Sequence, residues 1–312
     1  MTDRLPFSPE TIAQAAALIR AGQIVAVPTE TVYGLAADAT DAAAVARIYA
    51  AKGRPSFNPL IVHVPDFEAA DELAELGHIG KALADAFWPG PLTIVAPLRA
   101  GAPIASLVTA GLPTVAIRVP AHPAMRSLLE ACGRPFAAPS ANASGTISPT
   151  RADHVLRSLD GRIPLIVDGG ATGHGLESTI VAITDGRLRI LRPGPISPDA
   201  LTAAAGLPVA TDQSGAIEAP GQLASHYAPS HPLRLEALDQ RAGEWLIGFG
   251  PISGNRSLSR NGDLAEAAAH LFDALHEADA NATGGIAVAP IPEVGLGLAI
   301  NDRLRRAAAP KG

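Results

Sequence analysis

Short runs of β-branched and aliphatic residues recur along the first two hundred positions, and most are separated by segments with helical spacing. Apolar runs of this length, bounded by turn residues, are typical of buried strands. The predicted strands span 23–27, 60–64, 92–97, 114–119, 165–168, 179–183 and 188–191. The predicted helices between them lie at about 42–51, 66–87, 122–132 and 150–159. This alternation predicts an α/β or α+β fold, and it leaves the strand order open.

A further helix is predicted at the start of the chain, over about 9–21. Ser8 is suited to cap its first turn, Pro9 occupies the first helical position, and Gly22 follows the last one. Serine before a helix accepts a hydrogen bond from a backbone N–H of the first turn, and proline at the first position has no N–H that would need an acceptor.

Periodicity is lost between 206 and 232, where glycine, proline, serine and alanine accumulate. Such composition favours a linker of unusual length. Beyond it, strands are predicted near 233–237, 244–250 and 285–290, with helices at about 263–279 and 298–307. The chain has 312 residues, which exceeds the ~100–200 residues of a usual domain. We therefore expect one large domain followed by a second, smaller α/β domain.

Composition narrows the class of protein. Hydrophobic residues make up 47% and charged residues 17%, as in a globular chain. The net charge of −6 argues against a surface built chiefly for phosphate backbones, although it leaves a local basic cleft possible. Cys132 is the only cysteine, which excludes intramolecular disulfides and cysteine-rich zinc sites. Since neither a signal-peptide pattern nor a membrane-length apolar run is present, we expect a cytoplasmic protein with no membrane association.

Common nucleotide motifs are missing. Around Gly80-Lys81 the first glycine and the final Ser or Thr of a phosphate-binding loop are both absent. Gly248 and Gly250 follow a predicted strand as in a dinucleotide turn, but Ser253 stands at the third glycine position, so this match is weak. The histidines form no HExxH pattern, which disfavours a metal hydrolase.

Polar residues instead gather in loops beside the apolar strands, where function usually concentrates. Thr29, Glu30, Thr31 and Tyr33 follow the strand 23–27 in PTETVYGL, and a strand-to-helix turn capped by hydroxyls is the plain alternative to a functional loop.

Two further loops carry charged or polar residues. Lys52 and Arg54 flank a glycine and precede Asn58 in KGRPSFNPL, where they are either a solvated pair or a site for an anion. Ser140 and Asn142 lie in PSANASG among small residues, which let a ligand approach the backbone.

The ordered motifs PTETVYGL, KGRPxxNPLIVHV, WPGPLT, VAIRVP, PSANxSG and GLESTIV strongly resemble the YrdC/Sua5 family of threonylcarbamoyl-AMP synthases. The family's KxR and SxN nucleotide signature is matched by Lys52, Arg54, Ser140 and Asn142. The tail from SHYAPSHPL to GIAVAPIPEVGLGLAINDRL is similar to the longer, Sua5 type. The resemblance implies a twisted-sheet α+β catalytic domain over 8–196, a linker over 197–232 that crosses the site as a lid, and a small Rossmann-like domain over 233–312.

The resemblance also implies a reaction. L-threonine, bicarbonate and ATP would give threonylcarbamoyl-AMP and pyrophosphate, for the t6A modification at position 37 of transfer RNA. Lys52 and Arg54 would be the catalytic residues on the triphosphate. The implied ATP site comprises Lys52, Arg54, Asn58, Thr114, Ser140, Asn142, Ser148, Arg192 and Tyr227. The implied threonine site comprises Thr31, His63, Arg118, the backbone at Ala138, and Ser178.

Two of these residues have a physical case of their own. Arg118 lies in the apolar strand TVAIRV, and its head needs an anionic partner if buried, which a ligand carboxylate would satisfy. His63 is alone in LIVHV, where, without the motif around it, a core histidine bonded to backbone would be the better interpretation.

The remaining expectations concern the metal, the base and the partners. Mg²⁺ is expected with ATP, but no aspartate cluster predicts protein ligands for it. Glu30 and Glu177 are loop candidates for a general base, with a structural cap or a solvated carboxylate as the alternative. The product would pass to the tRNA threonylcarbamoyl transferase machinery, and direct tRNA binding stays open.

Two rival functions remain. A hydrogenase-maturation carbamoyltransferase contains a similar domain, but it carries many cysteines that this chain lacks. A double-stranded RNA-binding or regulatory module of the same fold is the other alternative, which the acidic net charge weakens.

Overall fold

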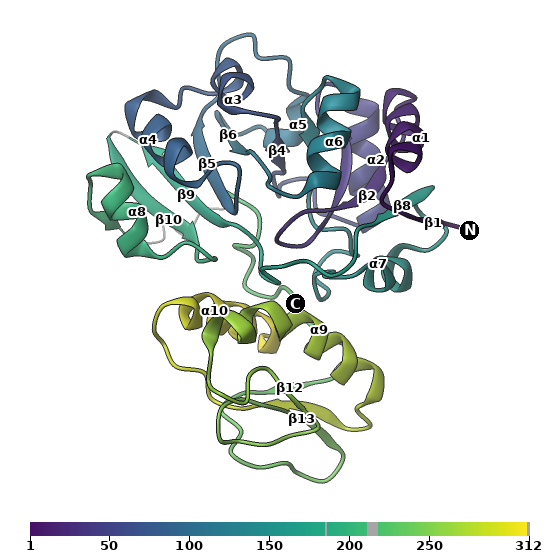
Figure 1. The fold of residues 1–312 in the computed structure, drawn as a ribbon, viewed down its shortest axis with the longest axis vertical. Helices are drawn as coiled ribbons and strands as arrows, with labels where there is room; N and C mark the ends of the chain where they lie inside the picture. Colours follow the sequence, from purple (N-terminus) through teal and green to yellow (C-terminus); the bar gives the residue numbers. More distant parts are fainter. Residues whose placement is uncertain (185, 211–217, 311–312) are drawn as a thin grey trace.

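A mixed sheet runs through the larger part of the molecule (Figure 1), in the order β1-β8-β2-β3-β7-β4-β6-β5-β9-β10-β11. The computed structural model describes residues 1–184, 186–210 and 218–310. The strands are β1 (Asp3–Pro6), β2 (Val25–Pro28), β3 (Tyr33–Asp38), β4 (Ile61–His63), β5 (Leu92–Pro97), β6 (Thr114–Arg118), β7 (Phe136–Ala137), β8 (Leu165–Asp168), β9 (Thr179–Thr184), β10 (Arg187–Arg192) and β11 (Val209–Ala210).

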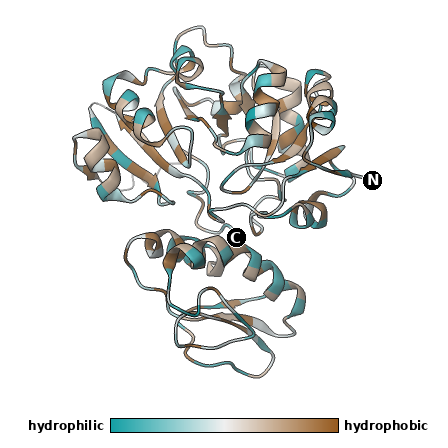
Figure 2. Ribbon diagram, in the orientation of Figure 1, coloured by the Kyte–Doolittle hydropathy of each residue, from teal (hydrophilic) through white to brown (hydrophobic). Residues whose placement is uncertain are grey.

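Helices cover this sheet, and Figure 2 shows the hydrophobic residues concentrated in its strands while polar residues lie on the outer sides of the helices. The helices are α1 (Pro9–Arg20), α2 (Ala42–Lys52), α3 (Phe67–Leu73), α4 (Gly77–Phe87), α5 (Ser106–Thr109), α6 (Pro123–Cys132), α7 (Ala152–Leu159) and α8 (Pro198–Ala205). Helix α1 begins as predicted: the Ser8 hydroxyl accepts from Thr11 N at 3.2 Å, and Pro9 is at the first position. Its apolar side packs with α6 in one core cluster.

The pattern missed several elements. Strands β1 and β3 were not predicted, and the helix predicted over 66–87 is two helices, separated at Ala74, which bridges to Leu98 instead of continuing the helix. Part of the predicted linker is ordered structure of the first domain: Leu201 of α8 lies in the main core cluster, and β11 pairs with β10. The linker residues 211–217 lie outside the described residues.

The smaller part contains a second, parallel sheet in the order β12-β15-β13-β14. Its elements are β12 (Leu233–Arg234), β13 (Glu244–Gly248), β14 (Arg256–Ser257), β15 (Gly285–Val288), α9 (Leu264–Asn281) and α10 (Leu296–Ala308). The two helices lie on the side of this sheet that faces the larger part (Figure 1). The chain is therefore an α/β protein with a large twisted sheet and a second, smaller α/β unit, as predicted.

The glycine that ends β13 and one in the loop after it have a structural reason. A Cβ on Gly248 would lie 2.2 Å from the Ile252 carbonyl oxygen, and one on Gly254 would lie 2.3 Å from that of Leu246. The loop folds back on its own strand there, so these glycines allow backbone to approach backbone. No helix among the described residues is long and apolar enough to cross a membrane.

Candidate active site

A small cavity of about 50 Å³ lies among the loops at one end of the large sheet. His63 ends β4 and Arg118 ends β6, and these two strands are parallel neighbours in which the two residues are register partners. The carboxyl ends of adjacent parallel strands therefore bring both side chains to one place. The wall is formed by Thr29, Thr31, Val32, Gly34, Arg54, Ile61, His63, Arg118, Ala138, Pro139, Ser140, Glu177, Ser178, Arg192, Pro220, Gly221, His226 and Tyr227.

The cavity gathers most of the residues predicted from the sequence. All five predicted threonine-binding residues line it: Thr31, His63, Arg118, Ala138 and Ser178. So do four of the residues predicted for ATP: Arg54, Ser140, Arg192 and Tyr227. The other predicted ATP residues are not part of its wall: Lys52, Asn58, Thr114, Asn142 and Ser148.

The turn after β2 is held together by Thr29. Its hydroxyl donates to Val32 O at 2.6 Å and accepts from the backbone N–H groups of Thr31 and Val32, both at 3.2 Å. It also lies 2.8 Å from the Thr31 hydroxyl. The chain then enters β3, which pairs antiparallel with β2. The alternative of a strand-to-helix turn is therefore wrong, because this turn joins two strands.

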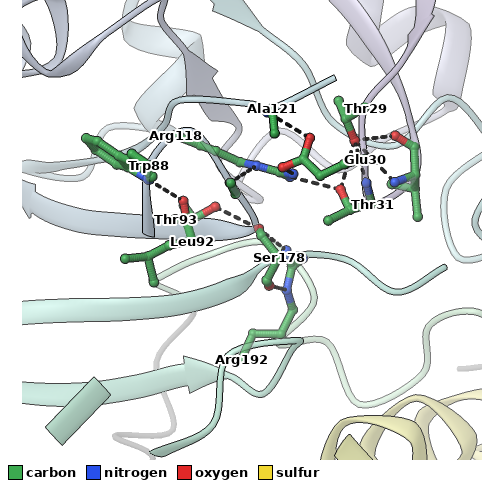
Figure 3. Close-up of polar contacts among 12 residues, drawn as sticks. Thr29, Glu30, Thr31, Trp88, Leu92, Thr93, Arg118, Ala121, Ser178 and Arg192 are labelled. Carbon is green, nitrogen blue, oxygen red and sulfur yellow. Dashed lines mark hydrogen bonds and ion pairs between the residues drawn. The ribbon is translucent and has the colours of Figure 1, made fainter. Parts of the chain in front are cut away.

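Arg118 is buried and is held by three groups at the edge of the cavity (Figure 3). Its guanidinium donates to Glu30 Oε1 at 2.6 Å, to Thr31 Oγ1 at 2.9 Å and to Gly90 O at 3.2 Å. The prediction that it needs an anionic partner is confirmed, but that partner is Glu30 of the chain itself. Burial alone would raise the pKa of Glu30; the charge and hydrogen bond of Arg118 outweigh this and lower the pKa to about 2.

Ser178 lies between Thr93 and Arg192 in the wall of the cavity (Figure 3). Its hydroxyl lies 2.7 Å from the Thr93 hydroxyl and accepts from Arg192 Nη2 at 3.1 Å. Arg192 also donates to the Ser178 carbonyl at 3.1 Å and to Pro220 O at 3.3 Å. Ser178, which was predicted for threonine, therefore contacts Arg192, which was predicted for ATP.

Lys52 ends α2 and supports the wall from behind. Its ammonium donates to Ser140 O at 2.6 Å and to the carbonyl of Asn142. Burial, and next the charge of Arg54, lower the pKa of Lys52 well below its ordinary value. In this geometry Lys52 fixes the loop 140–142, and its contact with a phosphate stays a prediction.

Arg54 reaches the cavity itself. It donates to Asn58 O at 3.1 Å and to Pro59 O at 2.7 Å. Burial lowers its pKa to about 10, so it is positively charged at neutral pH. Among the ion pairs of the described residues, none involves Lys52, Arg54 or Arg192. This side of the cavity therefore holds buried positive charge without carboxylate partners.

Several buried polar atoms around the cavity have no hydrogen-bond partner within the described residues. They are both amide atoms of Asn58, Nδ1 of His63, Nδ1 of His226 and the hydroxyl of Tyr227. Since buried polar groups are nearly always paired, such a group of unpaired atoms indicates that water or a ligand belongs between them. Burial, and next the charge of Arg118, lower the pKa of His63 to about 3, so its ring is neutral at neutral pH.

Two of the predicted ATP residues outside the wall have protein partners for their side chains, and a third lies at the far end of β6. Ser148 donates its hydroxyl to Glu177, and the Asn142 amide donates to Thr146 O at 2.9 Å. Thr114 begins β6, whose other end carries Arg118, and it is half-buried. Their contact with ATP stays a prediction.

Sequence reasoning missed several wall residues. Gly221 has a φ of 86°, and a Cβ there would lie 2.8 Å from the Tyr227 hydroxyl and 3.0 Å from Arg192 Cδ. Only glycine fits this position easily. The sequence did offer a signal for this position: Gly221 of APGQLASHY stands six residues before the lone Tyr227 in a polar stretch.

A magnesium ion finds no protein-made site in the described part of the chain. No group of three or more His, Cys, Asp or Glu side chains there could hold a metal. Glu177 in the wall and Glu30 behind Arg118 are each paired with an arginine. These residues do not fit a resident metal.

Comparison with known proteins places the chain in a family. A family model described as telomere recombination, for Sua5, YciO and YrdC proteins, matches residues 17–194. A second model, described as the C-terminal domain of threonylcarbamoyl-AMP synthase, matches residues 196–309. The chain belongs to the Sua5 family.

Relatives match nearly the whole length of the chain. The threonylcarbamoyl-AMP synthase of Bacillus subtilis is 44% identical over 333 residues, covering 99% of this chain and 96% of the relative. That of Pyrococcus abyssi is 40% identical, covering 94% and 93%. The structure of Pyrococcus abyssi Sua5 complexed with L-threonine superposes with a TM-score of 0.89 at 37% identity, over 99% of this chain and 97% of that one.

Proposed function

We propose that this chain is an L-threonylcarbamoyladenylate synthase, a nucleotidyltransferase that converts L-threonine, bicarbonate and ATP to threonylcarbamoyl-AMP and pyrophosphate. The observation that carries the proposal is the pairing of two environments in one cavity. Arg118 and Thr31 offer a cation and a hydroxyl on one side, while Arg54 and Arg192 offer cations without carboxylate partners on the other. The first suits an amino acid, and the second suits a polyphosphate.

The proposed chemistry needs alignment and charge stabilisation. Bicarbonate supplies carbon dioxide by releasing hydroxide. The amine of threonine captures the carbon dioxide and gives a carbamate, and the proton that the amine loses combines with the hydroxide to form water. One carbamate oxygen attacks the α-phosphorus of ATP, and the bond to pyrophosphate breaks. Two anions must approach each other in this step, so the buried cations lower its barrier by offsetting their charge. Arg54 and Arg192 line the cavity where that charge would develop.

Threonine would lie beside Arg118. The guanidinium is held by Glu30 and Thr31, so its position is fixed before a ligand arrives. The backbone at Ala138, the neutral ring of His63 and the hydroxyl of Ser178 would complete the pocket. Neither Glu30 nor Glu177 is proposed as the base that deprotonates the amine, because both are ionised partners of arginines with lowered pKa values.

The segment 218–228, which we call the strap, is proposed to be the lid over the nucleotide. His226 and Tyr227 enter the cavity wall from this segment, and Ala228 N donates to Gly145 O at 2.8 Å. The product is a mixed anhydride, and a closed strap would protect it from water.

Other parts of the proposal concern the surroundings of the enzyme. Mg²⁺ is proposed to arrive with the phosphates of ATP, and no step above depends on it. We propose that the enzyme works in the cytoplasm and passes its product to the tRNA threonylcarbamoyl transferase machinery.

The test is pyrophosphate release measured with threonine, bicarbonate or ATP left out in turn. We expect release to depend on all three, with serine supporting a lower rate. One methyl group in an apolar pocket is worth about 1–3 kcal/mol, so serine should be about 10- to 200-fold less efficient. Equal turnover with serine, or none with threonine, would contradict the proposal.

A double-stranded RNA-binding role is the second candidate and is not favoured. The buried cations lie inside a cavity of about 50 Å³, where no duplex backbone can reach them. If duplex RNA binding were the function, the chain would bind duplex RNA and would release no threonine-dependent pyrophosphate.

A further inference from the structure

Helix α10 of the smaller unit brings one arginine to the back of the cavity wall. Arg303 has no exposed surface, and by residue volume it ranks first among the fully buried side chains in the described part of the chain. It donates to Glu177 Oε2 at 2.9 Å, to Pro193 O at 2.9 Å and to Asp302 Oδ2 at 2.7 Å. Its guanidinium also lies over the ring of Tyr227, 5.4 Å from the centroid. An arginine with this many fixed partners defines the relative position of each of them.

The partners of Arg303 belong to the nucleotide side of the site. Glu177 lines the cavity and accepts a hydrogen bond from the Ser148 hydroxyl. Pro193 directly follows Arg192, and Tyr227 belongs to the strap. Burial by itself would raise the pKa of Glu177, but Arg303, and next Arg192, reverse this and lower the pKa. Without Arg303, Glu177 would be a buried carboxylate without its ion-pair partner.

The same helix also holds the strap. Arg306 donates to Leu223 O at 2.7 Å and accepts from His226 N at 3.2 Å through its carbonyl. The Ser225 hydroxyl donates to Ala309 O at 3.4 Å, one residue beyond α10. Asp302 links the two arginines, since it accepts from Arg303 and, at 3.0 Å, from Arg306. The end of α10 is therefore bound both to the strap and to the wall beneath it.

We propose that Arg303 is a positioning residue for the synthase reaction: it holds Glu177 and Tyr227 in the arrangement that receives the nucleotide. This inference rests on the proposed function. The inference gives the smaller unit a specific task, which is to fix the strap against the nucleotide side of the cavity. Among the described residues, Arg303 makes no hydrogen bond to the threonine side. The planar fork is required, because an ammonium group cannot donate to Glu177 and Pro193 O while stacking on the ring of Tyr227.

The test is Arg303→Lys in the full-length chain, with Arg305→Lys as the matched control. Arg305 lies two residues further along α10, where it forms an exposed pair with Glu293. We expect Arg303→Lys to raise the KM for ATP by about tenfold or more, the effect of losing a hydrogen bond to a charged group, with the KM for threonine within about twofold. The Arg305 variant should change neither. Hydrogen exchange of residues 218–228 should be faster in Arg303→Lys alone.

A second variant separates positioning from folding. Glu177→Gln keeps the side-chain shape but removes the charge that Arg303 holds, and it should show the same selective rise in the KM for ATP. If both variants keep normal values, or if both substrates are affected equally in a chain with an unchanged melting temperature, the inference is wrong. Should the wild-type chain release no pyrophosphate, the proposed function fails; the exchange measurement still tests whether Arg303 holds the strap.

Discussion

The side of the cavity that we propose binds threonine and the side that we propose binds the nucleotide are built in different ways. On the threonine side, Arg118 has its counter-charge in Glu30 and further support from Thr31. On the nucleotide side, Arg54 and Arg192 have only carbonyl and hydroxyl partners, and the Tyr227 hydroxyl has no partner among the described residues. The positive charge on the threonine side is neutralised by a carboxylate of the chain itself, whereas the nucleotide side still carries an excess of positive charge.

This difference separates two tasks of one site. A zwitterion such as threonine brings almost no net charge, so its pocket can be neutral and rigid beforehand. A triphosphate brings several negative charges, and a pocket neutralised in advance would bind it poorly. The uncompensated cations cost stability in the empty chain, because buried charge without a partner is unfavourable.

The largest effect is expected from Arg54→Ala, which removes a cation from the nucleotide side. We expect synthesis to be abolished, by at least about 10²–10³-fold, because a buried cation facing developing phosphate charge is lost. The fold should persist, since Arg54 has no ion-pair partner among the described residues. Product formation and a thermal melt measure the two effects. Arg47→Ala, exposed on α2, is the control. An unchanged rate would remove Arg54 from the site.

Arg118→Ala tests the other side. We expect threonine affinity to fall by about tenfold or more and ATP affinity to change little, as measured by separate calorimetric titrations. Because Glu30 then loses its partner, the double variant Arg118→Ala/Glu30→Gln should recover stability without recovering threonine binding. If the two affinities fall equally, the division into two sides is wrong.

Tyr227→Ala asks whether the strap protects the product. We expect a several-fold loss of threonylcarbamoyl-AMP with continued ATP consumption, because water enters when the ring no longer closes the wall. The measurement compares product formed with ATP consumed. Truncation after Pro198 would be a poorer probe, since it removes most of α8, whose Leu201 is part of the core. Fully coupled synthesis by Tyr227→Ala would argue for a plain tether.

The smallest effect concerns stability in acid. The pKa of Glu30 is lowered to about 2 in the folded chain, so its contribution is present above pH ~4.5 and is lost as the pH falls towards 2. We expect the free energy of unfolding to fall between pH 5 and 2 by roughly 3 kcal/mol more in the wild-type chain than in Glu30→Gln. Denaturant titrations at several pH values measure this. Glu68→Gln, exposed on α3, should behave like the wild type.

The sequence predicted those parts of the fold that periodicity and capping control. Each of the seven apolar runs of the first domain overlaps a strand, and α1 begins at the proline after its serine cap. Strand β3 was missed because YGLAAD is mostly small residues, whose place in the sheet comes from pairing with β2 and β7. Tertiary contacts, which no local pattern records, decide such strands.

The candidate site was predicted from motifs rather than from periodicity. A motif identifies site residues, but it does not identify the side chains that they contact in the folded chain. Thus Arg118 was expected to await a ligand carboxylate, although Glu30, 88 positions earlier, already neutralises it. Arg303 could not be identified at all. It shares the last turns of α10 with Arg305 and Arg306, and a basic helix end is ordinarily a solvated one.

The size of the cavity has a kinetic consequence. About 50 Å³ is far below the roughly 300–1,000 Å³ of sites that hold small-molecule ligands, so ATP cannot enter this conformation. Entry must wait for an opening, and the observed rate of nucleotide association should then level off as ATP concentration rises, at the rate of the opening itself. The same opening must also precede product release. Turnover can therefore be limited by a movement of the chain while the chemical step is fast.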